Sequence, residues 1–158
     1  MGAASVRGYQ GRDFSEPGRV LSCVKHFVGG SQPVNGTNGS PTDLSERTIR
    51  EIFFPPFKAG IDAGAYSMMT AHNELNGIPC HSNRWLMEDV VRGEWGDSKV
   101  FIVSDWMDVE HIHDLHRTAT RQQGRLPAVG KCGAWICTCT VPQLRKGDRT
   151  GQRGRSVR

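Results

Sequence analysis

The chain has 158 residues, 37% hydrophobic and 23% charged, a balance typical of one globular domain that excludes a largely disordered protein. It contains no run of about 18 apolar residues and begins with small and polar residues, so we expect no membrane span, no membrane partner and no secretory signal. Residues 121–158 carry nine Lys or Arg against one acid, whereas residues 1–120 carry eleven Lys or Arg against fifteen acids. The net charge of +4 therefore comes from the tail alone. Because the rest of the chain is acidic, we expect no nucleic-acid partner.

The first predicted elements are a strand and a helix. Residues 20–25 form a short apolar run, which predicts a buried strand. A helix is predicted near 45–60, because Asp43 with Glu46 makes a partial capping box and apolar residues then recur on one face. Pro55-Pro56 is expected to bend or break this helix midway, because proline lacks a backbone N–H.

The following elements repeat this order. Apolar runs at 65–71 and 99–104 predict two more buried strands, and a helix is expected between them near 84–93. Strands joined by crossover helices run parallel. The predicted fold class is therefore α/β, either a doubly wound sheet or part of an eightfold barrel, with the helices on the outer side.

Polar side chains follow each predicted strand. Lys25 and His26 follow the first, His72 the second, and Asp105 and Trp106 the third. In parallel α/β folds ligands bind at the carboxyl ends of the strands, so we expect these groups to share one site. Carboxylates, hydrogen-bond donors and an aromatic ring suit a sugar, whose hydroxyls need polar partners and whose C–H faces stack on rings.

Seven motifs along residues 1–120 occur in a familiar order and spacing. They are Lys25-His26-Phe27-Val28-Gly29, the Asp43 to Thr48 segment DLSERT, the Pro55 to Gly60 segment PPFKAG, the Met69 to Pro79 segment MTAHNELNGIP, Asn83-Arg84-Trp85-Leu86, Arg92-Gly93-Glu94-Trp95-Gly96 and Val103-Ser104-Asp105-Trp106. Together they resemble glycoside hydrolase family 3, the β-glucosidase-like enzymes.

This resemblance implies a fold, a reaction and a set of site residues. The chain would be a fragment of an N-terminal (β/α)₈ TIM-type barrel domain, and the enzyme a retaining glycosidase with Asp105 of the Ser-Asp-Trp motif as catalytic nucleophile. Lys25 and His26 would bind hydroxyls of the substrate sugar, and Trp106 would form a wall of the site. The implied partner is an oligosaccharide or glycoside, with no cofactor and no metal.

The second carboxyl of a retaining glycosidase, about 5–5.5 Å from the nucleophile, protonates the leaving oxygen. No residue of this chain is a clear candidate for it. The family generally supplies this acid/base from a later region, whereas its N-acetylglucosaminidase branch uses a His in the loop after the Lys-His-Phe motif. That loop, residues 28–38, contains no His, which favours the β-glucosidase type. We expect this chain alone to be inactive.

The tail departs from the family pattern. Residues 121–158 lack a clear apolar period, and we interpret them as a non-homologous basic tail, read out of frame and expected to be disordered. The five cysteines of the chain form no even set, so no disulfide framework is predicted. The Cys-x-Cys at Cys137 lacks the second ligand pair of a zinc site.

Two other functions stay open. The chain could be a carbohydrate-binding remnant without turnover, which keeps the sugar-facing groups but lacks half of the active site. Less favoured is a zinc metallo-hydrolase that uses His111, His113 and His116, because residues 111 and 113 of a helix point about 160° apart at roughly 100° per residue.

Overall fold

A computed structural model describes residues 1–12, 16–96 and 99–118. The predicted tail, from 121 onward, lies outside these residues. The elements in chain order are α1 (Gly2–Gln10), β1 (Cys23–Phe27), η1 (Val34–Gly36), α2 (Glu46–Thr48), η2 (Ile49–Phe53), α3 (Phe54–Asp62), β2 (Ser67–Thr70), β3 (Glu74–Leu75), β4 (Ile78–Pro79), η3 (Cys80–Ser82), η4 (Trp85–Glu94), β5 (Phe101–Val103) and α4 (Asp108–Asp114).

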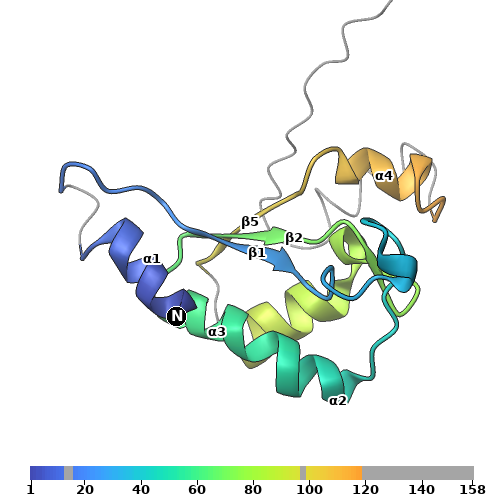
Figure 1. Ribbon diagram of the computed structural model, residues 1–158, viewed down its shortest axis with the longest axis horizontal. Coiled ribbons are helices and arrows are strands. Elements are labelled where there is room, and N and C mark those ends of the chain that lie inside the picture. Colours follow the sequence, from blue (N-terminus) through green and yellow to red (C-terminus); the bar gives the residue numbers. More distant parts are fainter. Residues whose placement is uncertain (13–15, 97–98, 119–158) are drawn as a thin grey trace, which may run out of the picture.

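The three predicted strands form one parallel sheet in the order β1-β2-β5. In Figure 1 the helical segments α3 and η4 lie beneath this sheet, as expected for crossover connections. The first strand begins at Cys23, and not at residue 20, and it continues to Phe27. The expectation that Lys25 and His26 follow the strand was therefore wrong, because both residues lie within β1, near its carboxyl end.

The helix after β1 continues through its proline pair, so the break that was one form of the prediction does not occur. A π-helical segment, η2, precedes the prolines, and the N–H of Phe54 donates to the carbonyl of Ile49, five residues back. Pro55 and Pro56 then occupy the first turn of α3, directly after this π-helical segment.

The core lies between the sheet and the helices. It is built around Phe27 of β1, whose ring is fully buried. The Phe27 ring centroid lies 5.7 Å from that of Phe54, 5.1 Å from Phe57 and 5.7 Å from Trp95. Met68 of β2 and Ile102 of β5 are also fully buried. Aromatic packing of this kind fixes α3 and the end of η4 against the sheet.

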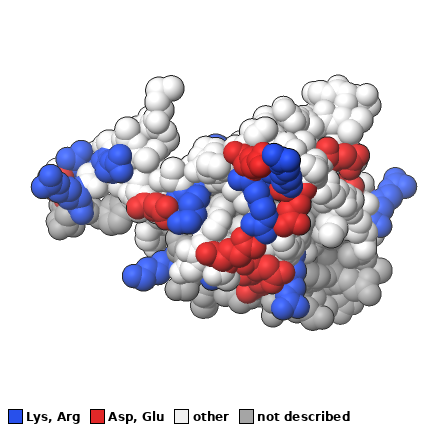
Figure 2. Space-filling view, turned by 90° about the horizontal axis from the view of Figure 1, so that it is seen from below, with Lys and Arg blue, Asp and Glu red and all other residues white. Residues whose placement is uncertain are grey.

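The solvent face of the helices is covered by paired charges. Arg50 lies 2.7 Å from Glu46 and 2.6 Å from Glu94, which ties η2 to the end of η4. Lys58 contacts Asp62 at 2.6 Å along α3. Figure 2 shows acidic and basic side chains interleaved over much of the face seen from below. No helix among the described residues is long and apolar enough to cross a bilayer.

Gly60 of α3 permits close packing of helix against strand. A Cβ at this position would lie 2.5 Å from Cγ1 of Val24, a branched side chain with little freedom to move. We therefore expect Gly60→Ala to lower the free energy of unfolding by about 1–3 kcal/mol, measured by denaturant titration. Gly8→Ala in α1 is the matched control, because a Cβ there meets no atom within 4 Å. It should stabilise the chain by about 0.5–1 kcal/mol, and equal gains in both variants would contradict the packing argument.

Candidate active site

The carboxyl ends of the three parallel strands meet at one cavity of about 460 Å³. Lys25 and His26 reach it from the end of β1, His72 from the segment after β2, and Asp105 from the segment after β5. The aromatic side chains of Phe53 and Phe57 are also among its lining residues. The structure thus brings together the polar groups that the sequence placed at the strand ends, with one exception.

That exception is Trp106. Trp106 is 54% exposed, and it is not among the residues that line this cavity. The next residue, Met107, has φ +58°, so the chain turns in the left-handed region directly before α4. Its role as a wall of the site stays a prediction.

Two imidazoles flank the carboxylate of Asp105. Nε2 of His26 lies 3.3 Å from Oδ2, and Nε2 of His72 lies 3.3 Å from Oδ1. Oδ1 also accepts a hydrogen bond of 2.6 Å from the backbone N–H of Trp106. The Asp105 side chain is only 14% exposed. These contacts hold the carboxylate of Asp105 in one orientation.

Behind Asp105 lies a second carboxylate, Asp108, which is 1% exposed. Nδ1 of His72 lies 2.6 Å from its Oδ1, and Nδ1 of His111 lies 2.8 Å from the same oxygen. Nδ1 of His81 lies 3.1 Å from Oδ2. The two contacts to Oδ1 are hydrogen bonds, whereas Oδ2 is buried and has no hydrogen-bond partner among the described residues. Burying a polar atom without a hydrogen bond costs free energy.

The buried His81 connects Asp108 to the backbone of Asp105. Its Nε2 accepts the N–H of Asp105 at 3.1 Å and also meets the hydroxyl of Thr70. Since Nε2 is an acceptor, Nδ1 carries the ring proton and faces Asp108. Burial lowers the pKa of His81 to about 4, so the ring is neutral near pH 7.

The three imidazoles of the zinc hypothesis have separate partners. His111 faces Asp108, whereas His116 contacts Glu74 at 2.9 Å through Nδ1. Nε2 of His113 lies 3.5 Å from Asp114. Among the described residues, the one set of His and carboxylate groups close enough to share an ion is His72, Asp108 and His111, which is not the predicted set.

Residues 1–129 match the model of the glycosyl hydrolase family 3 N terminal domain. The chain belongs to glycoside hydrolase family 3. Among curated members of the family, it is 43% identical over 120 residues to the beta-xylosidase of Formosa agariphila, a match that covers 73% of this chain and 16% of the relative. It is 35% identical over 133 residues to the periplasmic beta-glucosidase of Salmonella typhimurium, covering 84% of this chain and 17% of the relative.

Solved structures of beta-glucosidases are also similar to this chain. The beta-glucosidase of Listeria innocua in complex with glucose superposes with a TM-score of 0.81 at 32% identity, covering 88% of this chain and 19% of that one. A b-glucosidase from Erythrobacter marinus gives a TM-score of 0.79 at 34% identity, covering 85% and 18%. This family 3 chain therefore spans less than a fifth of the solved relatives that it matches.

Two residues of the site were missed by sequence reasoning. His81 follows a proline and a cysteine in a segment without a strong pattern, and Asp108 lies three residues after Asp105. Only the position of Asp108 at the start of α4 was a usable signal, because acids are common in the first turn of a helix. Their convergence on His72 depends on the fold.

Proposed function

We propose that this family 3 chain carries the nucleophile half of a retaining, exo-acting glycosidase for β-linked glucosides or related oligosaccharides. The observation that carries the proposal is the placement of Asp105 at the strand-end cavity, with His26 and His72 on its two oxygens. Lys25 lines the same cavity and supplies a cation for sugar hydroxyls. The family relationship and the positions of these residues both support hydrolysis of a glycosidic bond.

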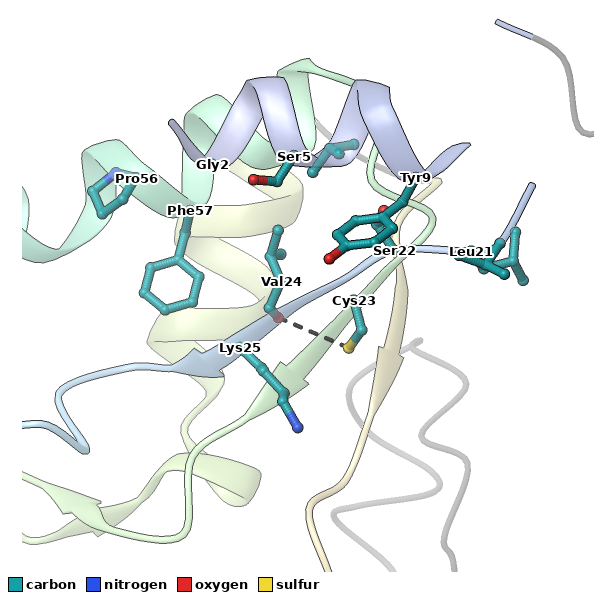
Figure 3. Close-up of a pocket in the computed structure, with 12 residues that line it drawn as sticks. Gly2, Ser5, Tyr9, Leu21, Ser22, Cys23, Val24, Lys25, Pro56 and Phe57 are labelled. Atoms are coloured by element: carbon teal, nitrogen blue, oxygen red, sulfur yellow. Dashed lines mark hydrogen bonds between the residues drawn. The ribbon is translucent and has the colours of Figure 1, made fainter. Parts of the chain in front are cut away.

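We propose further that the sheet belongs to a (β/α)₈ barrel. β1 and β5 are the two edges of the sheet, and each has an unpaired side among the described residues. Beside β1 lies an apolar cavity of about 600 Å³, shown in Figure 3, whose lining includes Tyr9, Val20 and Leu21. Val20 and Leu21 are each 56% exposed. Open edges with adjacent apolar surface are what a further strand and helix of a barrel would cover.

The proposed reaction starts with attack by Asp105 on the anomeric carbon. Oδ2 is the attacking atom, because Oδ1 already accepts a hydrogen bond from the Trp106 N–H. The bond from Oδ2 to the sugar forms as the bond to the leaving oxygen breaks, and an acid protonates that oxygen. Water then cleaves the glycosyl ester and restores the carboxylate. We assign the acid/base to the part of the enzyme that this chain does not span.

A second candidate for the isolated chain is carbohydrate binding without turnover. It is favoured by the extent of the match, because the chain covers only 16% and 17% of the curated relatives. Incubating the purified chain with an aryl β-glucoside separates the two. Release of the aryl group that disappears in Asp105→Asn would show that the chain is itself an enzyme, whereas sugar binding without release would support a binding remnant.

The proposed mechanism is tested by trapping its intermediate. A 2-deoxy-2-fluoro-β-glucosyl fluoride slows hydrolysis of the glycosyl ester, so the sugar stays on the nucleophile. In the complete enzyme that contains residues 1–118, we expect the peptide bearing Asp105 to gain the mass of one fluorosugar. A label on another carboxylate would remove Asp105 from the proposal.

The two other strand-end residues should affect turnover less than Asp105. Lys25→Ala and His26→Ala each remove contacts to the sugar or to Asp105, but not the atom that forms the bond. In the complete enzyme we expect each to lower kcat/KM for an aryl β-glucoside by roughly 10- to 1,000-fold, equivalent to about 1.4–4 kcal/mol. Exposed Arg47→Ala is the control, and an unchanged rate for either strand-end variant would exclude that residue from the site.

A further inference from the structure

The backbone of Asp105 lies just beyond the hydrogen-bonded part of the sheet. The pairing of β2 with β5 ends at Met69 and Val103, and Val103 is two residues before Asp105. Met107, two residues after Asp105, has φ +58°, so the chain turns directly behind it. The position of the proposed nucleophile therefore depends on contacts other than strand pairing.

His81 supplies such a contact. The backbone N–H of Asp105 donates to Nε2 of His81 at 3.1 Å. A backbone amide always carries its proton, so Nε2 is the unprotonated nitrogen of the ring. The His81 ring is buried, and burial lowers its pKa to about 4. The ring is therefore neutral near pH 7, and the acceptor that faces Asp105 is present.

The two nitrogens of the His81 ring differ in their surroundings. Nδ1 lies 3.1 Å from Oδ2 of Asp108, but that oxygen has no hydrogen-bond partner among the described residues. Nε2 instead accepts the Asp105 N–H and also contacts the hydroxyl of Thr70, the last residue of β2. The hydrogen bonds of the ring thus lie on the side that faces the proposed nucleophile.

The segment that carries His81 is itself anchored. It begins at Cys80, whose side chain is fully buried and whose backbone N–H donates to the carbonyl of Asn73 at 3.1 Å. Sγ of Cys80 donates to the carbonyl of Val28 at 3.6 Å. These bonds join η3 to the segments that follow β1 and β2, so the imidazole reaches Asp105 from a fixed support.

We propose that His81 is a positioning residue: its neutral imidazole accepts the backbone N–H of Asp105 through Nε2 and so fixes the attacking carboxylate at the strand-end cavity. The inference rests on the proposed function, because that function makes Asp105 the nucleophile. A ring that only filled space in the core would need no acceptor aimed at the Asp105 backbone. Displacing a reacting group by about 1 Å can lower a rate on the order of 10²-fold.

The hydrogen bond can be measured by nitrogen NMR without any variant. In the uniformly ¹⁵N-labelled 158-residue chain at pH 7.5, we expect His81 to carry its one ring proton on Nδ1. Scalar coupling across the hydrogen bond should connect Nε2 to the amide nitrogen of Asp105. A ring protonated on Nε2 would overturn the proposal, because that nitrogen could not then accept.

Two variants of His81 separate positioning from packing. The side-chain oxygen of Gln is as many bonds from Cβ as Nε2 is, so His81→Gln can keep the acceptor, whereas the oxygen of Asn is one bond closer and corresponds to Nδ1. In the complete enzyme that contains residues 1–118, we expect His81→Asn to lower kcat for an aryl β-glucoside roughly 10²-fold, with KM nearly unchanged. His81→Gln should stay within about tenfold of the unaltered kcat. Rates are expressed per site that the fluorosugar labels, so that unfolded enzyme does not count as lost kcat.

Ser82→Ala is the matched control, because this neighbouring side chain of η3 donates to the carbonyl of Pro79 at 3.2 Å, and its loss should leave kcat unchanged. An unaltered kcat in His81→Asn would refute the positioning role, and equal losses of kcat in His81→Asn and His81→Gln would assign His81 to packing. If His81→Asn fails to fold, the position of the ring proton in the unaltered chain still decides whether Nε2 can accept. If Asp105→Asn retained full activity, the nucleophile assignment would fail, whereas the NMR result would stand.

Discussion

Asp105→Asn should remove nearly all turnover of an aryl β-glucoside by the complete enzyme. The amide has almost the shape of the carboxylate and can still accept the Trp106 N–H, so the fold should be kept. It cannot form the covalent glycosyl ester, and we expect kcat to fall at least on the order of 10⁴-fold. The measurement is release of the aryl alcohol under saturating substrate.

Two further measurements make this test specific. Asp62→Asn is the matched control, because Asp62 is an exposed acid of α3 paired only with Lys58 in the described structure, and its activity should match that of the unaltered enzyme. In Asp105→Ala, azide can enter the vacated position and attack the anomeric carbon, with the aryl group leaving. The expected product is the α-glycosyl azide. Full activity of the Asn variant would exclude Asp105 as nucleophile.

The stability of the chain should fall as the solution is made acidic, because of His81. Its pKa is lowered from 6.5 to about 4 in the folded chain, chiefly by burial, so the unfolded chain binds the proton more tightly. This contribution to stability is complete above pH 6.5 and is lost as the pH falls toward 4. A difference of 2.5 units corresponds to roughly 3 kcal/mol of unfolding free energy.

Denaturant unfolding between pH 7.5 and 4.5, followed by tryptophan fluorescence, would measure this loss. His81→Gln cannot be protonated, so its stability should depend much less on pH, whatever its value at neutral pH. His113→Gln is the control, because that ring is 44% exposed and lies 3.5 Å from Asp114. If the free energy of unfolding fell equally with pH in the unaltered chain and in His81→Gln, another group would be the cause of the acid sensitivity.

The sequence alone determined the class of the fold and the polar residues that meet at the strand-end cavity. Apolar runs of a few residues, separated by amphipathic segments, are sufficient to predict parallel strands with crossover helices, and all three strands are present. The Lys25-His26 and Ser104-Asp105 motifs identified the family, and the family match confirmed it. These features are local in sequence, so periodicity and motif spacing reveal them.

The tertiary structure decided which residues from separate segments come into contact, which patterns along the sequence do not specify. His72, His81 and Asp108 come from three separate segments, and they meet because parallel strands end at the same edge of the sheet. Which nitrogen of each ring carries the proton depends on the acceptor or donor opposite it. The passage of a helix through Pro55-Pro56 likewise depends on a π-helical turn before the prolines, for which the sequence has no simple period. Such features depend on pairwise contacts in space, and spacing along the chain does not specify them.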